Sequence, residues 1–269
     1  MVIALFSWTK FHAQVNETDY PLQTDRPGQS INANTVGNKL FQLQSGYSYS
    51  EEASGLYLID AHLFDLQAKV GIVDRLEVSA LFQVASFGSD FQNTQQFPFL
   101  EDDSRSTGLS RLNIAVRGTL LEGKGLKPAI GLEATYLMAG VPGENLDVPA
   151  GRFILSFQNE LTDRISFTGN VIYLTTDFMQ FTANLCGSIT SDLGVFAEYW
   201  PIFAAAFETN QEMMRVESFL NSGAYWKMNN DLQFDLAFGF SVENQERMIE
   251  DFNPFYVQLG VTKRFNIKN

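Results

Sequence analysis

Residues 232–242 read LQFDLAFGFSV, and their side chains alternate between apolar and polar without interruption. A β-strand turns successive side chains to opposite faces, so this alternation predicts a strand with one apolar and one polar face. The apolar face consists of Leu232, Phe234, Leu236, Phe238, Phe240 and Val242, and the polar face of Gln233, Asp235, Ala237, Gly239 and Ser241. If the apolar face points inwards, the protein is a soluble β-sandwich. If it points outwards, the surroundings are lipid.

The same alternation recurs from about residue 40 to residue 265, as in RLEVSALFQV (75–84), RFILSFQNEL (152–161) and FYVQLGVTKRF (255–265). Two kinds of connection separate these segments. Five are tight turns rich in aspartate and glycine, which suit such turns, around Asp74, Gly123–Gly125, Asp163, Asp192 and Asp231. Six are mostly longer and polar, at residues 51–57, 86–108, 139–151, 175–178, 203–214 and 243–252. Together they predict twelve strands of about ten to twelve residues.

An even number of strands with short turns at one end and longer loops at the other is typical of outer-membrane barrels. We therefore predict an all-β fold: an antiparallel, up-and-down transmembrane β-barrel of about twelve strands over residues 39–266. The short turns are expected in the periplasm and the longer loops outside the cell. A soluble sandwich remains the alternative, because alternation alone does not distinguish the two.

The positions of the aromatic residues favour the barrel. Tyrosines lie on the apolar face near the loop ends of the predicted strands, at Tyr47, Tyr49, Tyr136, Tyr173 and Tyr199. Trp226 and Phe265 lie on the same face near the turn ends. Aromatic rings gather at both interfaces of a membrane, whereas a sandwich core gives no reason to sort them to strand ends.

The N-terminus and the composition limit the function. Residues 1–14 contain a short apolar run, Val2–Trp8, and are expected to be a signal peptide, although no basic residue precedes the run. The formal net charge of −13 argues against nucleic acid as a partner. With two histidines and one cysteine, the chain offers little for a zinc site, a disulfide framework or histidine-dependent catalysis. We expect no cofactor, no metal and no enzymatic activity.

Residues 23–46, QTDRPGQSINANTVGNKLFQLQSG, resemble the first segment of the outer-membrane proteins grouped as "MetA-pathway of phenol degradation" or simply "transporter". The match rests on Thr24, Asp25, Arg26, Pro27, Gly37, Gln42 and Gly46. AKVGIVDRLEVSA, residues 68–80, resembles the next signature of that family through Val70, Gly71, Arg75 and Glu77. The resemblance implies a barrel in the outer membrane of a Gram-negative bacterium that moves small aromatic or hydrophobic compounds.

Two interpretations of the TDRPG motif, residues 24–28, stay open. Pro27 restrains the backbone and favours a turn before Gly28, in a periplasmic segment over residues 15–38. Alternatively, this segment folds into the lumen as a plug, with Asp25 and Arg26 paired to luminal charges. Twelve strands lie between the small barrels filled by side chains and the large barrels that leave a channel.

The polar faces of the strands supply the candidate lumen-lining residues: Glu77, Arg117, Glu133, Glu160, Glu198, Glu217, Asp235 and Arg264. A net acidic ring of this kind favours neutral or cationic solutes. The sequence therefore predicts a monomeric channel whose partners are a small-molecule solute and outer-membrane lipid. The alternative is a sealed barrel that acts as a structural or surface-binding protein.

Three further features each have two interpretations. In loop 86–107, Phe87, Phe91, Phe97 and Phe99 form a landing site for a hydrophobic solute or pack the loop on itself. The acidic outer loops hold calcium or magnesium or, with no ordered ligand spacing, form a solvated surface. His62 faces outwards near a loop end, as in membrane-embedded hydrolases, but no serine is an obvious partner, so we expect no catalysis there.

Overall fold

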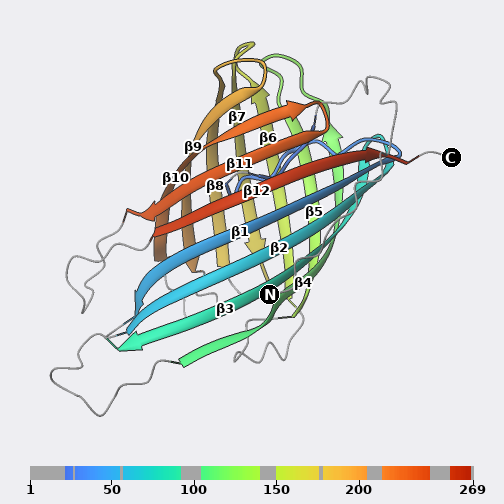
Figure 1. Cartoon of the computed structure of the whole chain (residues 1–269). Helices are drawn as coiled ribbons and strands as arrows, with labels where there is room; N and C mark the ends of the chain where they lie inside the picture. Colours follow the sequence, from blue (N-terminus) through green and yellow to red (C-terminus); the bar gives the residue numbers. More distant parts are fainter. Residues whose placement is uncertain are drawn as a thin grey trace.

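The computed structural model describes residues 22–26, 28–54, 57–91, 104–139, 150–175, 178–204, 214–242 and 255–267. Every regular element in these ranges is a β-strand (Figure 1). The strands are β1 (Leu40–Ser54), β2 (Tyr57–Val73), β3 (Leu76–Phe91), β4 (Ser104–Leu121), β5 (Ala129–Ala139), β6 (Ala150–Glu160), β7 (Ile165–Leu174), β8 (Phe178–Ser188), β9 (Leu193–Ala204), β10 (Met214–Asn229), β11 (Leu232–Ser241) and β12 (Phe255–Asn266). Among the described residues, no helix is long and apolar enough to cross a membrane.

The strands form one closed barrel in which each pairs antiparallel with its neighbours in sequence. The barrel closes where β1 pairs with β12, from Leu40 opposite Asn266 to Glu51 opposite Phe255. Closure satisfies the backbone N–H and C=O groups of strands that would otherwise lie at a sheet edge. The predicted all-β, up-and-down barrel of twelve strands is confirmed.

Several strands are longer than predicted. β2 has 17 residues and β4 has 18, where ten to twelve were expected. The ladder continues past the apolar alternation, since Tyr57 pairs with Phe91 and Ser89 with Ser104. Backbone hydrogen bonds require no particular side chain, so these hairpins extend into the segments predicted as loops, 51–57 and 86–108.

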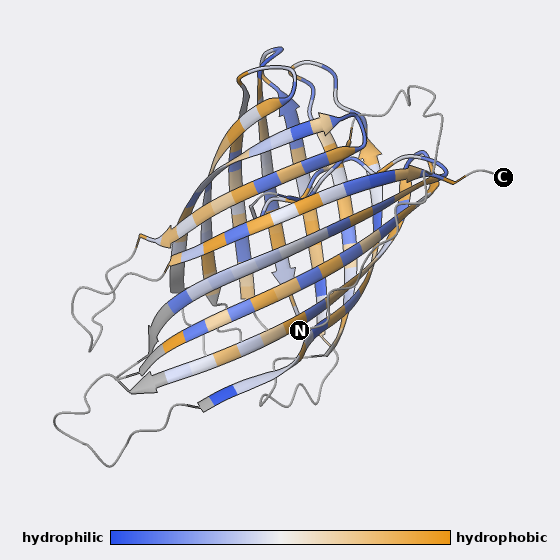
Figure 2. Cartoon of the chain, viewed as in Figure 1, coloured by the Kyte–Doolittle hydropathy of each residue, from blue (hydrophilic) through white to orange (hydrophobic). Residues whose placement is uncertain are grey.

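The apolar face of residues 232–242 points outwards. Phe234, Leu236 and Phe238 are exposed, whereas Gln233 and Asp235 on the opposite face are buried in the barrel interior. Figure 2 shows the resulting bands of apolar and polar residues along the strands. An exposed apolar surface around a polar interior suits a lipid environment. Tyr47, Tyr136, Tyr199, Trp226 and Phe265 are also exposed on this outer face, as the aromatic sorting predicts.

Candidate functional site in the barrel lumen

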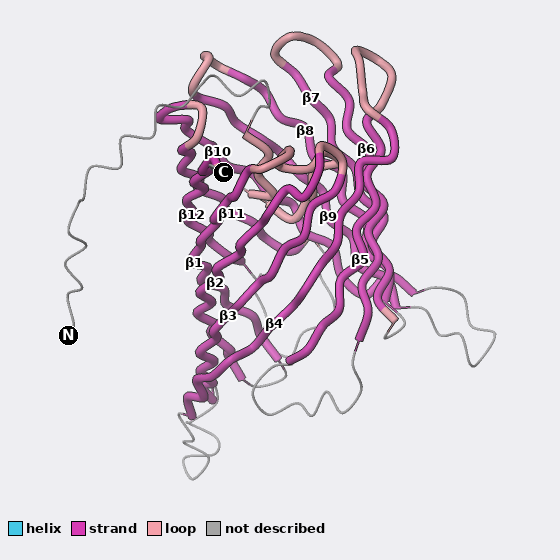
Figure 3. Tube along the Cα trace, turned by 90° about the vertical axis from the view of Figure 1, so that its right-hand side faces the viewer, coloured by secondary structure: helices cyan, strands magenta, loops and turns pink. Residues whose placement is uncertain are grey.

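Residues 22–26 and 28–38, here called the luminal segment, lie inside the barrel (Figure 3). Going backwards from β1, the segment follows the inner wall near the turn end. Its polar atoms bond in turn to inward-facing side chains of β3, β4, β6, β7, β8 and β9, namely Glu77, Thr119, Gln158, Asn170, Thr182 and Glu198. The chain then crosses the lumen, and Arg26 reaches β2, β11 and β12. The segment is thereby fixed to almost the whole circumference of the barrel.

Asp25 is the centre of a buried charge cluster. Its carboxylate accepts hydrogen bonds from both terminal nitrogens of Arg117, at 3.1 and 2.6 Å, and forms an ion pair with Lys69. Arg117 also pairs with Glu133 at 2.6 Å, and Glu77 lies 3.8 Å from both cations. Burial raises the pKa of Asp25, but the positive charges of Arg117 and Lys69 outweigh it and hold this pKa below its ordinary value. Asp25 therefore stays ionised.

Arg26 spans a second set of charges. Its guanidinium donates to Asp65 at 3.1 Å, to Asp235 at 3.3 Å and to the carbonyl oxygen of Leu259 at 3.1 Å. The barrel wall accommodates this guanidinium at Gly46 and Gly260, two glycines that are paired across neighbouring strands. A Cβ atom at either position would overlap the guanidinium. Glycine at these two positions leaves room for the arginine side chain to lie against the sheet.

Glu198 holds the luminal segment through hydrogen bonds and forms no ion pair with a cation in the described part of the chain. Its carboxylate accepts hydrogen bonds from the backbone N–H groups of Gln29 and Ser30, at 2.8 and 2.7 Å. Asn221 on the neighbouring strand donates to it at 2.7 Å. A buried carboxylate needs such donors in place of water, so Glu198 and the chain at residues 29–30 stabilise one another.

Most predicted lining residues face the lumen, and most of their charges are paired. Glu77, Arg117, Glu133, Glu198, Asp235 and Arg264 are buried, and Arg264 pairs with Asp231 at 2.9 Å. Glu160 is exposed at the turn end of β6. The side chain of Glu217 and the residue Pro27 lie outside the described residues. Thr24 bonds to Thr262 on β12 at 3.1 Å.

Sequence reasoning missed several luminal residues. Arg111 and Arg152 were absent from the predicted ring, although each shares the parity of an inward-facing neighbour, Arg117 and Ser156. An aromatic wall was also missed: the ring of Trp200 stacks on Phe219 at 5.0 Å, and Tyr256 lies 6.4 Å from Phe219. The alternation in the sequence indicates that these three rings face inwards. It does not indicate that rings from three different strands lie close together.

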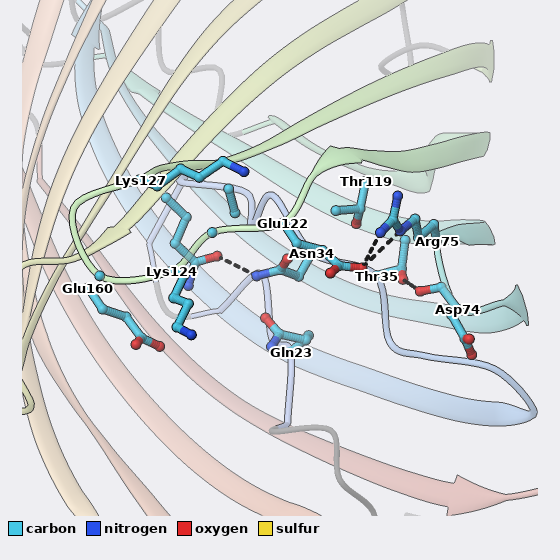
Figure 4. Close-up of a pocket in the computed structure, with 14 residues that line it drawn as sticks. Gln23, Asn34, Thr35, Asp74, Arg75, Thr119, Glu122, Lys124, Lys127 and Glu160 are labelled. Atoms are coloured by element: carbon cyan, nitrogen blue, oxygen red, sulfur yellow. Dashed lines mark hydrogen bonds and ion pairs between the residues drawn. The ribbon is translucent and has the colours of Figure 1, made fainter.

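Cavities lie on both sides of the luminal segment. The one at the turn end has a volume of about 400 Å³ (Figure 4). Around it, Thr35 donates to the carbonyl oxygen of Asp74 at 2.8 Å, and Arg75 pairs with Glu122 at 2.7 Å. A second turn-side cavity of about 260 Å³ reaches β10 and β11. A third, of about 230 Å³, lies towards the loop end between β1 and β4.

The outward-facing His62 is fully occupied. Its Nδ1 lies 2.7 Å from the hydroxyl of Tyr47, and its Nε2 lies 3.2 Å from the carboxylate of Asp60. Ser86 is opposite His62 in the β2–β3 ladder, a neighbour that sequence reasoning did not find. Both ring nitrogens of His62 thus have polar partners, on β1 and on its own strand β2. Of the predicted loop phenylalanines, Phe87 belongs to β3 and lines a cavity, whereas Phe97 and Phe99 lie outside the described residues.

No family model matches the chain, and no curated protein matches its sequence. Among solved structures, the crystal structure of the COG4313 outer membrane channel from Pseudomonas putida F1 is similar with a TM-score of 0.58 at 12% identity, covering 89% of this chain and 99% of that chain. The NanC porin is similar with a TM-score of 0.52 at 9% identity, covering 83% of this chain and 98% of that one. The KdgM porin has a TM-score of 0.52 at 10% identity, covering 82% and 99%. This protein therefore has the fold of outer-membrane β-barrels.

Proposed function

We propose that this protein is an outer-membrane channel for the passive uptake of small aromatic or hydrophobic compounds. The observation that carries the proposal is the space in the lumen: inward-facing residues line cavities on both sides of the luminal segment. A barrel with a purely structural role has no need of such space. The fold shared with structures described as an outer membrane channel and as porins supports the same function. Solutes would diffuse down their gradient.

The choice of solute rests on the apolar parts of the lumen wall. Trp200, Phe219 and Tyr256 form an aromatic wall. Leu63 on β2 and Phe87 on β3 contribute a second apolar surface, which lines the loop-side cavity. Stacking on an aromatic ring favours aromatic solutes over polar ones of the same size. The sequence resemblance to the phenol-degradation family points to the same class of compound.

The luminal segment would close the periplasmic half of this channel. Asp25 of the segment neutralises this part of the wall, because together with the wall residues Glu77 and Glu133 it balances Lys69, Arg117 and Arg152. The predicted acidic ring therefore has little free charge with which to select cations. We expect the channel to open when the segment leaves the wall, and the solute to be selected mainly by size and apolar contact.

One set of observations favours the alternative function, a sealed barrel with a structural or surface-binding role. The bonds that join the luminal segment to strands around the barrel are also those expected of a permanent seal. The two functions differ in a single respect: whether the segment leaves the lumen on the time scale of transport.

Single-channel conductance in a planar bilayer tests the proposal. The full chain should give rare or small current steps, and a chain lacking residues 15–37 should give larger and steady steps. Heat-dependent migration on gels verifies that both forms are folded barrels. Silence of both inserted forms would remove the channel and leave the sealed barrel. Equal, steady steps from both would show that the segment does not close the pore.

A further inference from the structure

The loop-side cavity has a mixed lining that the channel proposal leaves unexplained. Ile59, Ala61, Leu63 and Phe87 supply apolar surface from β2 and β3. Polar groups come from β1, β3 and β4, namely Ser50, Gln83, Ser110 and Arg111. All of these residues belong to the inward-facing set of their strands. The cavity is thus apolar on one side and carries a cation on the other.

A β-bulge adds a second inward-facing polar residue beside the cation. The register of β3 and β4 shifts between Gln83 and Val84, so that Gln83 is paired with Arg111 and Val84 with Leu109. Ser110 is the extra residue, and its hydroxyl donates to the backbone and side-chain oxygens of Gln83, at 3.3 and 3.1 Å. The bulge therefore brings Ser110 and Arg111 to the same inner face. Bulges commonly re-aim side chains at functional positions.

Arg111 differs from the other luminal cations because it has no partner of its own. The guanidinium makes no ion pair or hydrogen bond with any residue that the structure describes, and the side chain is exposed in the cavity. Asp65, a luminal carboxylate that interacts electrostatically with Arg111, is already paired with Arg26. The other nearby charge, Arg152, is positive and pairs with Glu133. A free guanidinium beside apolar surface is a site for an anion.

We infer that this cavity binds a small organic carboxylate with an apolar body, an inference that rests on the proposed channel function and names its solute class. The carboxylate would accept hydrogen bonds from two parallel N–H groups of Arg111, with the hydroxyl of Ser50 as a further donor. The apolar body would pack on Leu63 and Phe87. The volume of about 230 Å³ is below the range of about 300–1,000 Å³ typical of drug-sized ligands, so the body is small.

Phosphate and sugars fit this lining less well. A phosphate has no apolar part to bury against Ile59 and Leu63, and a sugar would leave the guanidinium without a counter-ion. An amine would meet Arg111 as a like charge. Among simple solutes, a monocarboxylate of about six carbons uses both sides of the cavity.

Isothermal titration calorimetry of the full chain in detergent tests the inference with three probes of one length: hexanoate, hexan-1-ol and hexylammonium. Hexanoate should bind at least about tenfold more tightly than the alcohol, because a hydrogen-bonded ion pair with a guanidinium is worth about a factor of ten or more. Hexylammonium should bind least. Acetate should bind more weakly than hexanoate, since it lacks the apolar body.

Variants of two arginines on β4 locate the site. Arg111→Gln should weaken hexanoate binding at least about tenfold and abolish its advantage over the alcohol, whereas Arg111→Lys should keep part of both. Arg105→Gln is the matched control, because Arg105 lies on the same strand but on the outer face, bonded to Asp60 at 2.8 Å. It should bind hexanoate like the unaltered chain.

Several outcomes would overturn the inference: no binding of hexanoate, equal binding of all three probes, or unchanged hexanoate binding in a folded Arg111→Gln variant. The calorimetry requires no current through the barrel, so such a result leaves the channel proposal to its own conductance test. Conversely, a silent barrel that binds hexanoate through Arg111 would be a binding protein without transport.

Discussion

The guanidinium of Arg117 donates two parallel hydrogen bonds to the carboxylate of Asp25, at 3.1 Å from Nη1 to Oδ1 and at 2.6 Å from Nη2 to Oδ2. The two residues are 92 positions apart in the sequence, and the pair joins the luminal segment to β4. Both side chains are almost fully buried. Removing one partner of such a pair leaves an uncompensated charge, which costs about 3–5 kcal/mol.

Asp25→Asn should loosen the luminal segment, because the amide keeps the shape of the carboxylate but leaves Arg117 and Lys69 without one of their counter-ions. A cost of about 3 kcal/mol changes the ratio of docked to undocked segment roughly a hundredfold. Single-channel recording should show correspondingly more frequent opening. Asp74→Asn is the control, since Asp74 contributes only its backbone oxygen to the segment. Equal opening in both variants would contradict the role of the Asp25–Arg117 pair.

The contribution of Asp25 to the closure should be insensitive to mild acid. Burial raises the pKa of Asp25, but Arg117 and Lys69 lower it further, so that it lies below the ordinary value of 3.8. A carboxylate with a lowered pKa contributes stability that is fully present above its unfolded value and lost only as the pH falls through its folded value. The ratio of opening frequencies between Asp25→Asn and the unaltered chain should therefore be the same at pH 7 and pH 4.5. An increase in the opening frequency of the unaltered chain over this range that disappears in Asp25→Asn would show that Asp25 titrates as a free carboxylate.

Gly131→Ala should displace the luminal segment without altering the outer surface. A Cβ atom at Gly131 would overlap the carbonyl oxygen of Ala33 in the segment, whereas at Gly118 on the adjacent strand the nearest atom is 3.8 Å away. Gly118→Ala is thus a control of the same size. Conductance should rise in the first variant alone, with heat-dependent migration unchanged in both. If Gly131→Ala behaves like Gly118→Ala, the segment does not lie against the wall in the membrane.

Much of this architecture could be predicted from the sequence, because the fold depends on a local signal. Alternation of the LQFDLAFGFSV kind determines which side chains share a face, and turn residues such as Asp74 and Asp231 mark where the chain reverses. Parity alone assigns Arg117 and Glu133 to inner faces, and both residues are buried in the barrel interior.

The partners of those residues could not be predicted, since they depend on register and on the path of the luminal segment. Nothing local to Asp25 selects Arg117 over another luminal cation. The bulge at Ser110 likewise leaves no local signal, yet it turns Ser110 into the loop-side cavity beside Arg111. The extended ladders of β2 and β4 were missed because backbone pairing does not require alternation.

Glu198→Gln should weaken the part of the luminal segment at residues 29–30. The carboxylate accepts from donors at both oxygens, Gln29 and Asn221 at one and Ser30 at the other. An amide would turn an NH₂ group towards N–H donors on one side, which costs about 1–3 kcal/mol. Hydrogen exchange of the Gln29 and Ser30 amides should become roughly tenfold faster. Glu160→Gln, at an exposed position at the turn end of the same inner wall, should leave both amides unchanged; acceleration in both variants would indicate a general loosening of the barrel.

The aromatic wall should set the preference for aromatic solutes. Trp200 stacks on Phe219 inside the lumen, whereas Trp226 stacks on Phe234 on the outer face at 6.0 Å. In the chain lacking residues 15–37, reversal potentials give the permeability ratio of benzenesulfonate to methanesulfonate, two anions that do not cross lipid. Trp200→Ala should lower this ratio about two- to tenfold, because an aromatic contact is worth about 0.5–1.5 kcal/mol. Trp226→Ala removes the same side chain from the lipid side and should leave the ratio unchanged. If the two variants have the same permeability ratio, ring stacking in the lumen does not select the solute. That result would contradict the proposed preference for aromatic compounds but not the proposed channel function.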